Sequence, residues 1–390
     1  MPGLKPFPFL VPSLARCFVL SLLLFCVGPG LTGVGAQASE AGPSFTDEAI
    51  TDEAVTGEAI SEEAASQSAV IPQKIVITQK PLTLLVSELA GERATLVQVI
   101  PDGASPHEFS LSWSGRRQLA DADLVVWGGA ALEPQLANVM ATLPAGKVFD
   151  ASAAVTHWPR AVDCHEHGHE GAHAADGADH VDPGHESHDV GHNGSPACLD
   201  PHFWLNPRNM AAVAEALLER LLTLAAVDEA SSESVASLER LENSAQALLE
   251  RIDTLDQQAQ AMLAPLADRF YVVEHDAYNH FSQHYGLRQP GFLRAGHGMP
   301  IGPRSFSALL ARTDIGCVYT EPEYSPKLAQ RLAAHTGATL QELDPLGSRV
   351  ALAQGYSGFM ARFVATFAGC FPVDAKAEEA APGEAAPLKK

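Results

Sequence analysis

The sequence has little positive charge and few cysteines, and beyond its first residues it has no long apolar run. Its 25 Lys and Arg residues stand against 47 Asp and Glu residues, which gives a formal net charge of −22 at pH 7. A chain of this charge repels phosphate backbones, which argues against nucleic acid as a partner and favours cations. No later segment approaches the roughly 20 apolar residues that span a bilayer, so no further membrane span is expected.

The N-terminus has the pattern of an export signal. Two basic residues precede the apolar run 17–27, and the small-residue motif Ala36-Gln37-Ala38 follows it. We therefore expect residues 1–38 to be a cleaved signal peptide, which places the mature protein in the periplasm. An uncleaved anchor is disfavoured because the run is too short to span a bilayer. A lipid anchor on Cys26 is disfavoured because the preceding residue is a bulky Phe.

Four cysteines remain after the signal: Cys164, Cys198, Cys317 and Cys370. An even number in an oxidising compartment predicts disulfides. Of the three pairings, Cys164 with Cys198 and Cys317 with Cys370 keeps each bridge local. A thiolate metal site is the alternative, which exposure to oxidant makes less favourable.

Two segments hold most of the excess negative charge. Residues 39–73 and 161–198 each contain eight acidic residues and no Lys or Arg. The first includes the repeat TDEAI-TDEAV-TGEAI-SEEAA, whose composition cannot bury enough apolar surface to fold, so we expect a flexible linker.

The folded part begins near Lys74 and alternates strands with helices. Short β-branched runs predict strands at KIVIT (74–78), TLVQVI (95–100), LVVW (124–127), RFYVVE (269–274), CVYT (317–320) and TLQEL (339–343). Amphipathic stretches such as 82–91 and 325–337 predict helices, and Gly337 is a good helix C-cap. This alternation predicts an α/β fold with mainly parallel sheets, in two lobes.

A helical region separates the two groups of strands. Residues 209–228 predict one helix. A second, longer helix is predicted because apolar residues recur at alternating steps of three and four: Leu238, Leu241, Ala245, Leu248, Ile252, Leu255, Ala259 and Met262. We expect this stripe to pack against the chain's own lobes. A coiled-coil dimer is the alternative.

These observations give the following domain prediction. The parts are a signal peptide (1–38), an acidic repeat linker (39–73), an N-terminal α/β lobe (74–228) with a disordered His-rich loop at about 157–198, a long connecting helix (229–264), a C-terminal α/β lobe (265–372) and a flexible tail (373–390).

Nine of the 16 histidines lie within 36 residues, in a segment without apolar periodicity. Flexible imidazoles and carboxylates are ligands that Zn²⁺, Ni²⁺ and Cu²⁺ accept. After His157, the predicted auxiliary metal ligands are His165, His167, His169, His173, His180, His185, His188 and His192.

Three other histidines stand in more defined settings. His107 follows the strand 95–100, His275 ends the strand 269–274, and Asp344 ends the strand 339–343, while His202 leads into a helix. Open α/β sheets place their ligand sites at the carboxyl ends of strands. Each residue alone is weak evidence, but together they predict that these side chains converge in one cleft.

These residues lie within a series of longer motifs. In chain order the motifs are PDGASPHEFSL, ADLVVWGG, PHFWLNP, EHDAYNHFSQHYGL, TEPEYSP and LDPLG. Over about residues 74–371 the sequence resembles the metal-binding substrate-binding proteins of ABC importers, and most closely the zinc-binding ZnuA type. This resemblance implies two α/β lobes joined by a long helix, with the metal at the lobe interface.

The resemblance also implies the site residues. The zinc ligands would be His107, His202 and His275, with Asp344 or water at the fourth position. Some relatives carry an acidic residue just before the first ligand, where this chain has Pro106. Cys317 and Cys370 match a disulfide common in the zinc-binding members, and the His-rich segment lies where those members carry theirs.

Zinc is also favoured by the donor atoms. Neutral imidazoles suit tetrahedral Zn²⁺, whereas Mn²⁺ prefers oxygen ligands. Manganese-binding relatives usually carry a carboxylate where this chain has His275.

The expected function is the capture of Zn²⁺, as a transported ligand, in the periplasm and its delivery to an ABC permease. A periplasmic zinc chaperone is a further candidate partner, and no enzymatic activity is expected. The alternatives are a manganese- or iron-binding member of the same family, a zinc-dependent hydrolase, and an adhesin or metal buffer without a permease. A hydrolase is disfavoured because no HExxH motif lies on a predicted helix. The two matches to this pattern, 165–169 and 169–173, fall in the His-rich segment, which has no apolar periodicity.

Overall fold

The computed structural model describes residues 71–159, 199–225, 232–295 and 298–371. The predicted signal peptide, most of the repeat linker, most of the His-rich segment and the predicted tail lie outside these residues. Ile71 is only 6% exposed and packs in the core, so the folded part begins before Lys74. Within the described residues, no helix is both long enough and apolar enough to cross a membrane.

The N-terminal lobe is built on a parallel sheet of four strands in the order β2-β1-β3-β4. The strands are β1 (Lys74–Ile77), β2 (Thr95–Gln98), β3 (Leu124–Trp127) and β4 (Val148–Asp150). The sequence predicted the first three. It gave no signal for β4, an edge strand of three residues.

The C-terminal lobe has a second sheet, with the order β7-β6-β5-β8-β9. The strands are β5 (Phe270–His275), β6 (Gly291–Ala295), β7 (Met299–Pro300), β8 (Ile315–Thr320) and β9 (Thr339–Glu342). All pairs are parallel except β6 with β7. The prediction of two lobes with mainly parallel sheets is therefore confirmed, although β6 and β7 were missed.

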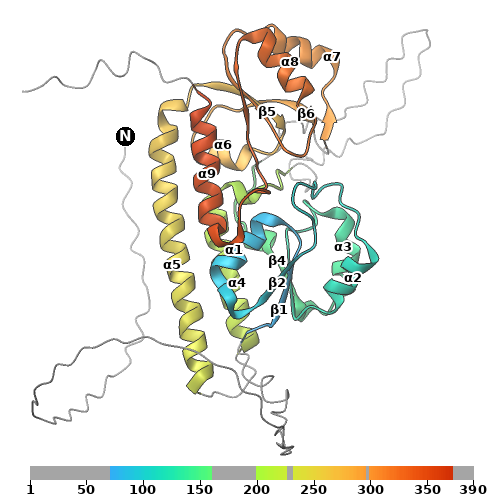
Figure 1. Cartoon of the computed structure of the whole chain (residues 1–390), viewed down its shortest axis with the longest axis vertical. Coiled ribbons are helices and arrows are strands. Elements are labelled where there is room, and N and C mark those ends of the chain that lie inside the picture. The colour runs from blue at the N-terminus through green and yellow to red at the C-terminus, as the bar shows by residue number, and fades with distance from the viewer. Residues whose placement is uncertain (1–70, 160–198, 226–231, 296–297, 372–390) are drawn as a thin grey trace, which may run out of the picture. The chain divides into compact units, whose positions relative to one another are not determined.

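The helices cover both sheets (Figure 1). They are α1 (Lys80–Ala90), α2 (Trp113–Ala120), α3 (Pro134–Met140), α4 (Pro207–Ala225), α5 (Ser232–Leu263), α6 (Asn279–His284), α7 (Pro303–Leu310), α8 (Lys327–Thr336) and α9 (Gly355–Gly369). Helix α8 ends as predicted, because Gly337 takes the left-handed conformation with φ 76°.

One apolar core runs through both lobes. The largest cluster of buried residues joins Ile75 and Ile77 of β1 to Tyr271 and Val273 of β5 through residues of α1, α4, α5 and α9. Two smaller clusters fill the opposite faces of the sheets, one under α2 and α3 and one under α7 and α8. Because the main core is shared, the two lobes cannot separate without exposing apolar surface to water.

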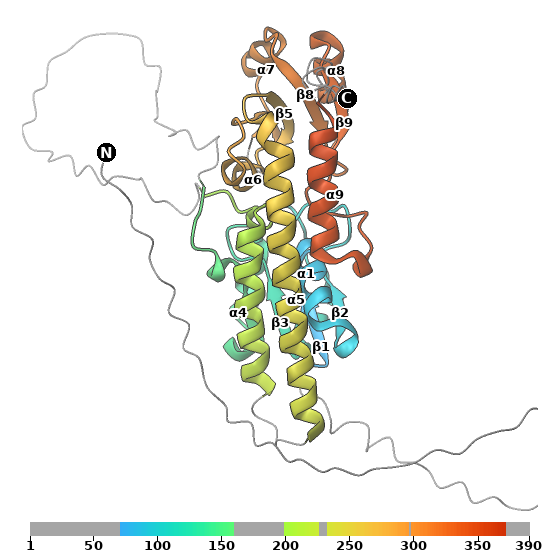
Figure 2. The ribbon, with the colours of Figure 1, turned by 90° about the vertical axis from the view of Figure 1, so that its left-hand side faces the viewer.

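Helix α5 is the long helix that the sequence predicted, and at 32 residues it measures about 48 Å. It lies beside α4 and α9 and runs past both sheets (Figure 2). Most of its predicted stripe, from Leu241 to Ala259, is buried in the chain's own core. The stripe therefore packs within the chain, and the coiled-coil alternative is wrong.

The end of the stripe was predicted one residue too early. Met262 is 48% exposed, whereas Leu263 is fully buried. The alternation of three and four assumes 3.5 residues per turn, but a straight helix has 3.6. Over seven turns the difference moves the buried position from residue 262 to residue 263.

This difference gives a test of the shared core. Leu263→Ala should lower the free energy of unfolding by about 2–5 kcal/mol, because it leaves a cavity in the buried cluster. Met262→Ala, at an exposed neighbour, should change it by less than about 0.5 kcal/mol. Urea denaturation of both variants measures the two effects. Equal losses would show that the register of α5 is wrong.

Candidate metal centre

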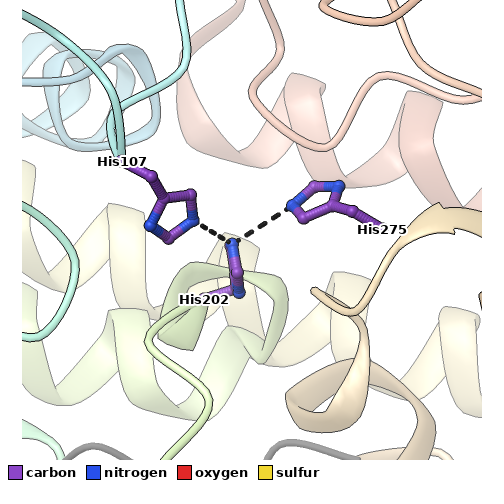
Figure 3. A group of neighbouring side chains, drawn as sticks. All are labelled: His107, His202 and His275. Carbon is purple, nitrogen blue, oxygen red and sulfur yellow. Dashed lines mark hydrogen bonds between the residues drawn. The ribbon is translucent and has the colours of Figure 1, made fainter. Parts of the chain in front are cut away.

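Three histidines meet between the lobes, each from a different element (Figure 3). His107 lies in the loop after β2, His202 just before α4, and His275 at the end of β5. The Nε2 atom of His202 is 3.0 Å from Nε2 of His107 and 3.4 Å from Nε2 of His275. One ring nitrogen from each residue lies within 4.8 Å of the other two, a spacing that can hold a metal ion.

His202 is held by a buried carboxylate two residues before it. One oxygen of Asp200 accepts hydrogen bonds from Nδ1 of His202, at 2.6 Å, and from its backbone N–H, at 2.9 Å. The other oxygen accepts the backbone N–H of Asn279, at 2.9 Å. Burial alone would raise the pKa of Asp200, but its interactions with His202 and His280 hold that pKa well below its usual range.

His275 is held by a second buried carboxylate. Nδ1 of His275 lies 2.6 Å from Oε2 of Glu321, which directly follows β8, and the hydroxyl of Tyr278 donates to the other oxygen at 2.8 Å. Burial alone would lower the pKa of His275, but the charge and hydrogen bond of Glu321 outweigh it and raise the pKa to about 9.

The two carboxylates decide which ring nitrogen is available to a ligand. Because Asp200 and Glu321 occupy Nδ1 of His202 and His275, the Nε2 atoms are directed toward the centre of the group. Histidine ligands of zinc commonly give their other ring nitrogen to a carboxylate in this way, which fixes the ring and strengthens the metal bond. The arrangement thus fits a metal ion bound by imidazole nitrogen.

Of the four predicted cleft ligands, all of them among the described residues, Asp344 alone is not part of this group. Its carboxylate accepts the backbone N–H of Leu346 at 3.2 Å and the hydroxyl of Ser348 at 2.8 Å. An Asp that bonds to the backbone two residues later stabilises a turn. In this structure Asp344 therefore organises the loop after β9, and its role as a fourth ligand stays a prediction.

A cleft of about 500 Å³ lies beside the histidines and is lined from both lobes. The loop after β2 contributes Ser105 and Glu108, and the C-terminal lobe contributes Arg294, Glu323 and Tyr324. Burial, together with the nearby Glu321, raises the pKa of Glu323 to about 8. Tyr324, in the wall of the cleft, contacts the ring of His275, with the ring centroids 5.5 Å apart.

Neither Asp200 nor Glu321 was predicted as a site residue, although Asp200 directly precedes the motif PHFWLNP and Glu321 lies inside TEPEYSP. The sequence alone held a signal only for Asp200. Asp200 stands two residues before a candidate ligand, and Glu321 follows β8, the strand that neighbours β5 in the sheet. Recognising Glu321 required the strand order, which the sequence did not provide.

Of the two predicted disulfides, the structure contains the one between Cys317 of β8 and Cys370 after α9. Cys164, Cys198 and the eight auxiliary histidines from His165 to His192 lie outside the described residues. His157 is described and is exposed at the surface.

Comparisons with known proteins identify the family of this chain. A family described as "Zinc-uptake complex component A periplasmic" matches residues 75–370. The "High-affinity zinc uptake system protein ZnuA" of Yersinia pestis is 27% identical over 308 residues, which cover 76% of this chain and 90% of that protein.

Solved structures show the same fold at lower identity. The periplasmic zinc-binding protein TroA of Treponema pallidum has a TM-score of 0.59 at 18% identity, covering 76% of this chain and 98% of its own. A manganese-bound periplasmic metal-binding protein of Candidatus Liberibacter asiaticus has a TM-score of 0.58 at 13% identity, covering 77% and 99%.

The family match spans both lobes and includes all three histidines of the centre. The chain therefore belongs to the family of periplasmic A components of zinc-uptake complexes, the ZnuA-type metal-binding substrate-binding proteins.

Proposed function

We propose that this protein captures Zn²⁺ in the periplasm through His107, His202 and His275 and delivers it to an ABC permease. The observation that carries the proposal is the convergence of three imidazoles, two of which are held by buried carboxylates. We propose water as the fourth ligand, because Asp344 lies outside the group of three histidines and its carboxylate stabilises the turn after β9.

The choice of zinc rests on the donor atoms. Three imidazole nitrogens suit Zn²⁺, whereas Mn²⁺ prefers carboxylate and water oxygens. Manganese remains the second candidate cargo because a related fold is manganese-bound. Competition between the two ions for the purified protein separates these candidates.

We propose transport in preference to hydrolysis. A zinc hydrolase needs a general base within reach of metal-bound water. Glu108, the carboxylate next to His107, is an exposed side chain at the wall of the cleft. Delivery to a permease is supported by the Yersinia pestis relative, which is named for a high-affinity zinc uptake system.

The described residues that flank the His-rich segment lie beside the centre. The backbone N–H of Asp200 donates to the carbonyl of Pro159 at 2.9 Å, two residues from His202. We propose that the histidines of the segment raise the local zinc concentration near the cleft. A signal peptide at 1–38 and a second disulfide, between Cys164 and Cys198, belong to the same proposal.

The role of His275 can be tested directly. His275→Ala should weaken zinc binding more than tenfold, because it removes one of three ligands. His335→Ala is the matched control: an exposed histidine of the same lobe, whose loss should leave the affinity within about twofold of the parent. Competition with a chromophoric chelator measures both, and unchanged affinity in the His275 variant would remove this residue from the site.

Zinc binding should release a proton. Zinc requires a neutral imidazole, and below about pH 9 the metal-free protein holds a proton on His275. The apparent affinity should therefore rise with pH and level off above about pH 9. An unperturbed imidazole, with a pKa of about 6.5, would reach its plateau near pH 7.

Calorimetry at pH 8 in buffers of different ionisation enthalpy counts the released protons. We expect about one proton per zinc, the proton that His275 carries in the metal-free protein. Glu321→Gln removes the charge that raises the pKa of His275 and should reduce the count. A parent that releases no proton at pH 8 would contradict the assignment of this ion pair.

Asp344→Asn separates a water ligand from a carboxylate ligand. The amide oxygen can still accept the N–H of Leu346, so the loop should keep its conformation. If water is the fourth ligand, zinc affinity should fall less than about threefold. A loss of more than tenfold would show that Asp344 moves onto the metal.

A further inference from the structure

His107 is carried by a loop that is fixed at its start and again just before His107. The loop begins with a turn in which the N–H of Ala104 donates to the carbonyl of Pro101. The carboxylate of Asp102 accepts Nζ of Lys80 at 3.0 Å and Nε2 of Gln98 at 2.9 Å. These bonds tie the start of the loop to the beginning of α1 and the end of β2.

The middle of the loop, just before His107, is tied by Gln135. Its Nε2 donates to the carbonyl oxygen of Pro106 at 2.6 Å. That oxygen belongs to the peptide group that joins Pro106 to His107. Because a peptide group is planar, a bond that holds its oxygen also restrains the nitrogen and Cα of His107. The imidazole of His107 projects from this restrained Cα.

Gln135 itself sits on a fixed support. It is the second residue of α3, and the next residue, Leu136, is fully buried. The residue before the helix, Glu133, is also fully buried, and its carboxylate accepts the N–H of Gly128 at the end of β3 at 3.2 Å. The contact with the end of β3 therefore fixes the start of α3, and with it the side-chain amide of Gln135.

The other two histidines are fixed to each other. Asp200 bonds to His202 and to the backbone of Asn279 in the C-terminal lobe. The ring of His280 lies 3.0 Å from the carbonyl oxygen of Asp200 and 3.0 Å from the side-chain amide of Asn209. His202 and His275 thus form one buried unit across the lobes. His107 is half-buried and belongs to a separate loop.

We propose that Gln135 is the positioning residue for His107, and that its bond to Pro106 sets how fast zinc leaves the three-histidine centre. Gln135 does not contact the metal. It holds the third ligand against the pair of His202 and His275, and release begins when the His107 loop moves away. The inference rests on the proposed function, since it assumes that zinc binds at these histidines.

A double-mutant cycle tests this role with zinc as the probe. Gln135→Met removes the donor without changing side-chain length or charge. In the parent protein it should speed zinc dissociation, measured by chelator trapping, about threefold to tenfold, the effect of one hydrogen bond. In the His107→Ala background the same change should alter dissociation by less than about 1.5-fold, because there is no third imidazole to position.

Two controls isolate the effect. Gln330→Met, at an exposed position of α8, should leave dissociation unchanged in both backgrounds. Gln135→Ala is a second variant that removes the same donor, and thermal unfolding of each metal-free variant confirms that it folds.

Three outcomes would overturn the inference. An unchanged rate in Gln135→Met would show that the bond does not hold His107. Equal acceleration with and without His107 would show a general structural role. A parent without a tight zinc site would overturn the proposed function as well, which distinguishes that failure from the first two.

Discussion

The carboxylate of Asp200 holds an imidazole and two lobes at the same time. One oxygen binds Nδ1 of His202, and the other binds the backbone of Asn279 in the C-terminal lobe. A fully buried carboxylate that lost these partners would cost several kcal/mol, so the lobes must stay in contact at this point. The shared core around α5 reinforces the same contact. The centre therefore forms where the fold is least free to open.

The second carboxylate shows how such a site can exist both with and without its cation. In the metal-free protein the charge of Glu321 is balanced by a proton on His275. When a metal replaces that proton, the cation supplies the balancing charge through the same imidazole. Neither state leaves a buried charge uncompensated, so loading and release need not disrupt the core. The movable part can then be as small as the loop that carries His107.

Much of this arrangement could be predicted from the sequence, and the exceptions have physical reasons. His107 and His275 were found because both follow apolar β-branched runs, and parallel strands place their carboxyl ends at one edge. Short edge strands such as β4 and β7 bury too little to leave a pattern. The partner of His275 could not be predicted, because Glu321 is 46 residues away and meets it only through the pairing of β5 with β8. Asp344 was a reasonable candidate by position, but local hydrogen bonds to its own loop engage its carboxylate.

The most direct test of this account is a crystal structure of the zinc-loaded protein, with anomalous diffraction measured at the zinc edge. The account predicts a zinc peak about 2.0–2.1 Å from Nε2 of His107, His202 and His275. Asp200 and Glu321 should remain on the Nδ1 atoms of His202 and His275. The account would be contradicted by a principal zinc peak outside this group, or by direct binding of zinc to either of these two carboxylates.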